Sequence, residues 1–91
     1  MTMLRIDITT DGSLRLLRVI GDLRADELEE LERHLNGSSK EVTLDLEELK
    51  IVDLAAVLFL LQCEDRGIRM VDCPYYVREW MSRERERRRP G

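Results

Sequence analysis

The sequence predicts a single-domain α/β protein with a mixed, mostly parallel sheet of about four strands and the element order β-β-α-β-α-β-α. Three observations lead to this prediction. A hairpin pattern opens the chain, segments of helical and strand periodicity then alternate, and 91 residues is a length that suits one compact domain. Strands and helices that alternate after a hairpin are typical of a sheet whose later strands are joined by right-handed crossovers.

An antiparallel hairpin is expected at the start of the chain. Apolar and polar residues alternate over residues 4–9, which is the period-two pattern of a strand with one buried face. Asp11-Gly12 then marks a turn, and residues 14–20 form a second apolar strand. The connection is too short for a crossover, so the two strands must be antiparallel. We expect the first strand to lie at an edge of the sheet.

A helix and a third strand follow the hairpin. From residue 25 to 35, leucines recur at helical spacing behind an acidic first turn, which suits the dipole of a helix that ends near Asn36. Residues 42–46 alternate again and predict the third strand. Residues 47–51 are expected to connect this strand to the next helix.

The second predicted helix, from Leu54 to Arg66, is apolar on almost every side as far as Leu61. Such a helix must be covered by neighbouring elements or by a partner. Asp53 is suited to cap its first turn, because a carboxylate there accepts from unpaired backbone amides. Gly67 ends the helix, and a fourth strand at residues 68–71 and a helix starting near Pro74 complete the predicted order.

The charge pattern divides the chain into a domain, residues 1–83, and a charged C-terminal tail, residues 84–91, whose order the sequence leaves open. The net charge is −4, but from Arg78 onward six arginines and three glutamates give +3, which leaves −7 for residues 1–77. An acidic body argues against a nucleic-acid surface. The longest apolar run has eight residues, too few to span a membrane, so we expect no membrane insertion. No secretory signal is visible, and we expect a cytoplasmic protein.

Several short motifs, in order and spacing, resemble the STAS family (sulphate transporter and anti-sigma-factor antagonist) of bacterial regulators. Gly21-Asp22-Leu23 matches the element that precedes the first helix in that family, and Leu44-Asp45-Leu46 matches its apolar strand. Gly67, between the second helix and a short strand, matches a third element. The resemblance covers residues 14–81 and implies the STAS fold.

The sequence departs from the family at its functional turn, where relatives read Asp-Ser-Ser-Gly. Asp53 is kept, Leu54 and Ala55 replace the serines, and Ala56 replaces the glycine. Ala55 therefore occupies the position of the family's phosphoacceptor and cannot be phosphorylated. By this resemblance, the partner-binding residues are Asp53, Leu54, Ala55, Ala56 and Val57. Val57 is expected mainly in the core, whereas for Leu54 and Ala55 core and surface positions are equally compatible with the sequence.

The resemblance implies a non-enzymatic protein–protein interaction module that acts in signalling and transcription regulation and needs no cofactor. Its partner would be an ATP-binding anti-sigma-factor kinase. One alternative keeps the fold and makes the chain an accessory subunit of the ATPase of an ABC-type lipid transporter. Another is a homodimer joined through the edge strand.

Four other kinds of side chain are candidates for a catalytic, metal-binding or partner-binding role: cysteine, aspartate, histidine and the aromatic residues. Cys73 lies at a predicted helix start, where a lowered thiol pKa would suit a small redox protein, but no second cysteine stands at Cys-x-x-Cys spacing. Asp53 has no convergent acidic partner, and the single histidine, His34, has no cluster of ligands around it in sequence. Tyr75, Tyr76 and Trp80 are aromatic residues that can anchor a partner, but the spacing of Val77, Trp80 and Met81 favours packing against the sheet. We therefore predict neither a catalytic site nor a metal site.

Overall fold

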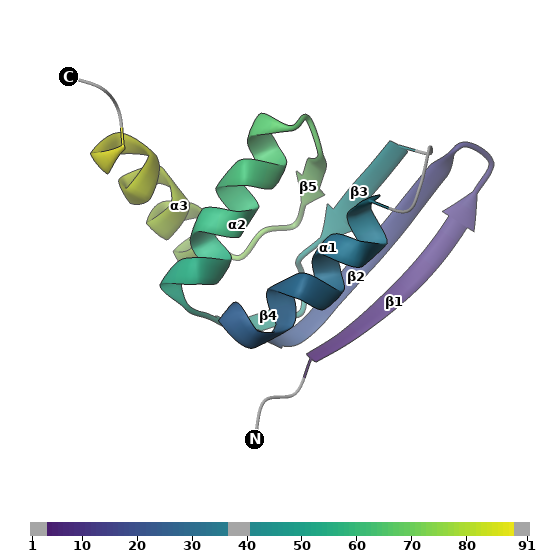
Figure 1. The fold of residues 1–91 in the computed structure, drawn as a ribbon, viewed down its shortest axis with the longest axis horizontal. Coiled ribbons are helices and arrows are strands. Elements are labelled where there is room, and N and C mark those ends of the chain that lie inside the picture. Colours follow the sequence, from purple (N-terminus) through teal and green to yellow (C-terminus); the bar gives the residue numbers. More distant parts are fainter. Residues whose placement is uncertain (1–3, 37–40, 89–91) are drawn as a thin grey trace.

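The computed structural model of the chain describes residues 4–36 and 41–88, which form one mixed sheet with three α-helices (Figure 1). The predicted fold class is confirmed, and the order of the elements is as expected apart from one additional strand. In chain order the elements are β1 (Leu4–Asp11), β2 (Leu14–Leu23), a 3₁₀ turn η1 (Ala25–Glu27), α1 (Leu28–Asn36), β3 (Glu41–Asp45), β4 (Leu49–Val52), α2 (Leu54–Asp65), β5 (Arg69–Val71) and α3 (Tyr75–Arg87).

The hairpin of β1 and β2 is antiparallel and uninterrupted. Its register runs from Leu4 opposite Gly21 to Asp11 opposite Leu14. Gly12 is the first of the two turn residues and has a φ of +59°, which a type II′ turn requires at that position and which glycine adopts without strain. As predicted, β1 lies at one edge of the sheet.

The strand β2 organises the rest of the sheet. On the side away from β1, its first half pairs in parallel with β3, and its end, from Gly21 to Leu23, pairs in parallel with β4. The register shifts between Gly21 and Asp22, where Gly21 has a φ of +95°. A glycine is suited to this bulge because a side chain there would be strained. Beyond β3, the short strand β5 forms the other edge.

The strand β4 corrects the prediction that residues 47–51 only connect two elements. A turn over residues 46–49 is closed by a hydrogen bond from the amide of Leu49 to the carbonyl of Leu46, and β4 starts directly after it. Leu49 and Val52 are buried, while Lys50 and Ile51 between them are exposed. Because the register of β4 is irregular, its burial does not alternate with period two and the sequence pattern did not indicate a strand.

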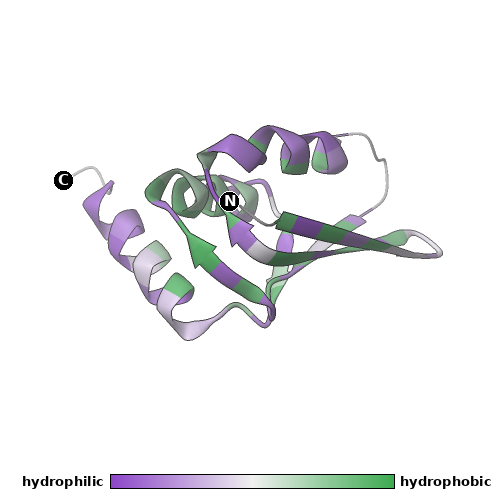
Figure 2. Cartoon of the chain, turned by 90° about the horizontal axis from the view of Figure 1, so that it is seen from below, coloured by the Kyte–Doolittle hydropathy of each residue, from purple (hydrophilic) through white to green (hydrophobic). Residues whose placement is uncertain are grey.

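The helices α1 and α2 lie against one face of the sheet, and α3 packs beside α2 (Figures 1 and 2). Figure 2 shows α2 as hydrophobic over most of its surface and α1 as hydrophilic on the side away from the sheet. Coverage by the sheet and by α3 explains how α2 tolerates so few polar residues. The core is built mainly from leucine and valine of the strands and the three α-helices, and includes Leu17, Val19, Leu23, Leu31, Leu44, Leu46, Val57, Leu60 and Val77.

The last helix begins where the sequence predicted and extends further. Pro74 precedes its first residue, and Val77 and Met81 are buried against the core. The helix continues past the predicted domain boundary at residue 83 and ends at Arg87. The final residues of the predicted tail, 89–91, lie outside the described residues.

Candidate functional site

Asp53 joins the starts of two helical segments. Its Oδ1 accepts a hydrogen bond of 2.9 Å from the amide of Ala56, in the first turn of α2, and its Oδ2 accepts one of 3.0 Å from the amide of Ala25, at the start of η1. The predicted capping role is therefore confirmed. Because both carboxylate oxygens are engaged, Asp53 fixes the position of α2 relative to the chain that enters α1.

The charge of Asp53 is stabilised by these contacts. Partial burial alone would raise its pKa, but the backbone amides of Ala25 and Ala56, together with the positive charge of Arg24, hold the pKa below its usual value. The carboxylate is therefore ionised near neutral pH, which is the state in which it accepts from both amides.

The five residues predicted to bind a partner occupy two different environments. Leu54 is 47% exposed and Ala55 is partly exposed, so both offer side-chain surface at the entrance to α2. Ala56 and Val57 are completely buried in the core and offer none. Asp53 is partly exposed between the two groups, with its carboxylate directed to backbone amides.

Two further exposed side chains lie close to this entrance. Ile51, at the end of β4, is 45% exposed, and Tyr76, in the first turn of α3, is also 45% exposed. The Tyr76 hydroxyl donates a hydrogen bond to the backbone carbonyl of Lys50, which attaches the start of α3 to β4 beside Ile51. Burial raises the pKa of Tyr76, so its hydroxyl keeps the proton that it donates.

We call the surface formed by Ile51, Asp53, Leu54, Ala55 and Tyr76 the α2 corner. It combines ends of β4, α2 and α3. The hydrogen bond of Tyr76 joins α3 to β4, and those of Asp53 join the start of α2 to η1. Chemically it offers apolar and aromatic surface on a fixed backbone, with Arg24 nearby as a cation. Such a surface is suited to binding another protein.

Sequence reasoning assigned Ile51 to a connecting segment and so missed it as part of the corner. A signal was present, since Lys50-Ile51-Val52 is β-prone and precedes the capping Asp53. Tyr76 was recognised only as a possible anchor, because nothing in the sequence shows that its hydroxyl reaches a strand in a different part of the chain.

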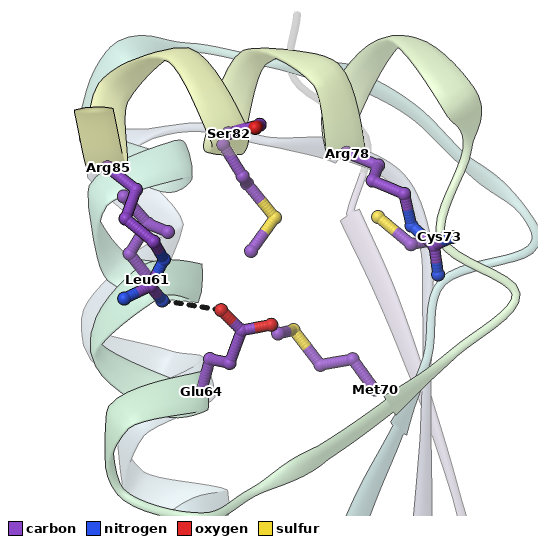
Figure 3. A pocket seen from close by; sticks show the side chains of 8 residues that line it. Leu61, Glu64, Met70, Cys73, Arg78, Ser82 and Arg85 are labelled. Carbon is purple, nitrogen blue, oxygen red and sulfur yellow. Dashed lines mark hydrogen bonds and ion pairs between the residues drawn. The ribbon is translucent and has the colours of Figure 1, made fainter. Parts of the chain in front are cut away.

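A separate pocket of about 240 Å³ lies between α2, β5 and α3 (Figure 3). Its lining includes Cys73 and Met70, and an ion pair between Glu64 and Arg85 spans one side. Burial raises the pKa of Cys73. The positive charge of Arg78 lowers this pKa and the negative charge of Glu64 raises it, but burial has the largest effect. The Cys73 thiol is therefore protonated at neutral pH. A reactive cysteine requires the thiolate, which is the more nucleophilic state.

Within residues 4–36 and 41–88, no three or more His, Cys, Asp or Glu side chains are grouped so that they could hold a metal ion. The helices described there include none with the length and apolar character needed to cross a membrane.

No protein-family model matches the chain, and no curated protein matches it significantly. The resemblance to the STAS family therefore stays a prediction that depends on the motifs quoted above.

Proposed function

We propose that the protein is a non-enzymatic interaction module, similar to anti-sigma-factor antagonists, that binds a regulatory protein through the α2 corner in the cytoplasm. The observation that carries this proposal is the exposure of Leu54 and Ile51, two large apolar side chains that flank the capped start of α2. Isolated exposed apolar residues are common, but here two lie three positions apart on a backbone that hydrogen bonds hold in place.

The corner has the properties of a binding surface without a phosphorylation switch. In the STAS-like reading, Ala55 occupies the phosphoacceptor position, and its side chain is accessible there. A phosphate at this point would add a charge of about −2 that an apolar interface would have to desolvate. With a methyl group in its place, binding depends on the partner's concentration alone.

The resemblance makes an ATP-binding anti-sigma-factor kinase the expected partner. We test this by affinity purification from the native host, with the partner identified by mass spectrometry. Wild-type protein is expected to recover one specific protein, and Leu54→Asp is expected to lose it, because the substitution places a charge on the apolar side of the corner.

Leu14→Asp provides a matched control. Leu14 is 50% exposed, almost the same as Leu54, and it lies at the start of β2, whereas β4 pairs with the end of that strand. Leu14 and Leu23 are nine residue steps apart, which puts Leu14 about 30 Å from the corner along the strand. If the Leu54→Asp variant still recovers the partner, or if Leu14→Asp loses it to the same extent, the partner binds elsewhere.

A further variant distinguishes an anti-sigma-factor kinase from the ATPase of an ABC-type transporter as the partner. If the recovered protein is a kinase of the anti-sigma type, Ala55→Ser restores the missing hydroxyl, and incubation with the purified partner and ATP should add one phosphate to the chain. Recovery of an ABC-transporter ATPase would instead favour the accessory-subunit function. Phosphorylation of the wild-type chain at a different residue would contradict an unswitched module.

A further inference from the structure

The two edges of the sheet differ in how far they are protected from pairing with another strand. The strand β5 has only three residues and is followed by Asp72, whose φ of +53° turns the chain away. The strand β1 has eight residues, contains no proline, and pairs with β2 without a bulge over its whole length. Long, regular edge strands of this kind are the ones that accept a further strand.

The hairpin register determines which backbone groups of β1 are free. Asp11 and Leu14 flank the two-residue turn, so they form a hydrogen-bonded pair. Because such pairs alternate along antiparallel strands, Arg5, Asp7 and Thr9 also direct their backbone groups toward β2. The amides and carbonyls of Leu4, Ile6, Ile8 and Thr10 consequently point away from the sheet.

The side chains of β1 divide between the two faces of the sheet. Ile6 lies opposite the buried Val19 and Ile8 lies opposite the buried Leu17, so Leu4, Ile6 and Ile8 are on the face that the helices cover. Leu4 and Ile6 are only partly buried, and Ile8 is 41% exposed. An apolar row at the sheet edge is therefore incompletely covered.

The charged residues of β1 lie on the opposite face and are of opposite sign. Arg5 and Asp7 form an ion pair of 3.0 Å through Nε, with side chains 74% and 39% exposed. The terminal nitrogens of Arg5 remain as donors, because a guanidinium has five N–H groups. A partner strand that presents the same two residues in reverse order would meet complementary charges.

A second copy of this chain carries those two residues in the required order when its β1 runs antiparallel. An antiparallel pairing centred on Ile6 sets Arg5 against the second copy's Asp7 twice by symmetry, Ile6 against Ile6, and Leu4 against Ile8. A centre at Asp7 or at Arg5 would instead oppose like charges, which is unfavourable. A centre at Ile8 would set Ile6 against threonine and lose apolar pairing.

We propose that the protein forms a symmetric homodimer in which β1 pairs antiparallel with β1 of a second copy around a two-fold axis at Ile6. The free backbone groups of Leu4, Ile6 and Ile8 then form hydrogen bonds between the copies. The two five-stranded sheets become one continuous sheet, with α1 and α2 of both copies on the same face. This dimer does not depend on the α2 corner or on the function proposed for it.

A charge exchange tests both the interface and its register. Molar mass is measured by sedimentation equilibrium over a range of protein concentrations, with folding checked by circular dichroism. Arg5→Asp and Asp7→Arg each oppose two pairs of like charges and are expected to raise the dimer Kd at least about tenfold. The double variant Arg5→Asp/Asp7→Arg restores both pairs and is expected to return Kd to near the wild-type value.

Arg83→Asp is the matched control for Arg5→Asp, because it makes the same change in charge and breaks a similarly exposed ion pair, with Glu79, on α3. It is expected to leave the dimer Kd unchanged. A wild-type chain that stays monomeric through the high micromolar range overturns the proposal, and so does a dimer that the single variants do not weaken or that the double variant does not restore.

A disulfide gives an independent measure of the axis. In a Cys73→Ser background, Ile6→Cys places two thiols on hydrogen-bonded opposing residues, where Cα atoms are about 5.5 Å apart and a disulfide can form. Ile8→Cys places them about 14 Å apart along the strand. Oxidation should link the first variant and not the second, and the reverse result would exclude an axis at Ile6.

Discussion

Replacing Asp53 by alanine is expected to lower the free energy of unfolding by about 2 kcal/mol. The carboxylate accepts hydrogen bonds from two backbone amides, those of Ala56 and Ala25. Loss of a helix cap costs about 1 kcal/mol, and a second hydrogen bond to a charged acceptor contributes a similar amount. Asp53→Asn keeps one acceptor oxygen without the charge, so it should cost about half as much.

These changes are large enough to measure in a chain of 91 residues. A domain of this size loses about 1 kcal/mol of stability per molar urea, so Asp53→Ala should move the unfolding midpoint by about 2 M. The corresponding decrease in Tm is about 8–16 °C. Urea unfolding followed by circular dichroism at neutral pH gives both values, with Asp53→Asn measured in parallel.

The pH dependence provides a second and more specific test. The pKa of Asp53 is lower in the folded chain than in the unfolded chain, so its carboxylate adds stability that is complete above the unfolded pKa. That stability is lost as the pH falls through the folded pKa, below about pH 4. The difference between wild type and Asp53→Ala should therefore shrink as the pH is lowered from 5. Equal stability of the two proteins at pH 7, or a difference that does not change on acidification, would refute the capping account.

Three further predictions concern single groups. Tyr76→Phe removes the hydroxyl that donates to Lys50 and should lower the unfolding free energy by up to about 1 kcal/mol in urea titrations. Gly67→Ala should cost about 1–2 kcal/mol in the same assay, because φ is +84° and no atom lies within 4 Å of the added Cβ, so only backbone strain changes. Burial raises the pKa of Cys63 to about 12 and also raises that of Cys73, so alkylation at pH 8 should be slow at Cys73 and should require unfolding at Cys63. Rapid modification of both thiols in the folded chain would contradict this.

Local patterns in the sequence were sufficient to predict most of the fold. The hairpin follows from the alternation of residues 4–9 and the Asp11-Gly12 turn, and the cap of α2 follows from an acidic residue directly before an apolar run. Both features depend on residues that are neighbours in sequence. The edge position of β1 was also predicted, since the short turn leaves it only one adjacent strand in the chain order.

The strand β4 and the arrangement of the corner depend on contacts between distant residues. The backbone of β4 pairs with the end of β2 after the bulge at Gly21. The Tyr76 hydroxyl donates to the carbonyl of Lys50 from a helix more than twenty positions later in the chain. Neither contact has a periodic signature in sequence. The capping residue Asp53 was thus sufficient to predict where the corner lies. The structure was needed to show that Ile51 and Tyr76 belong to it.

The geometry of a helix explains why only part of the predicted binding segment is accessible. Successive residues are rotated by about 100° around the axis, so four consecutive residues cover almost the whole circumference. A helix that lies on a sheet must therefore bury some members of any such set. Here Ala56 and Val57 face the core, and Leu54 and Ala55 face outward. A contiguous motif taken from a family resemblance does not by itself show which of its residues are buried and which are exposed.

The β1 dimer and the α2 corner together predict a stoichiometry for the complex with a partner. A two-fold axis at Ile6, perpendicular to the sheet, keeps both α2 corners on the same face of the dimer. Strand spacing and residue rise place the corners roughly 35 Å apart, because five strand intervals and about eight residues separate them. A dimeric partner able to span that distance would bind both corners and gain affinity from the second contact. Native mass spectrometry should then show two copies of each protein, and Arg5→Asp should weaken the complex although Arg5 is outside the corner. A partner that binds Arg5→Asp and wild type equally well would show that each corner binds independently.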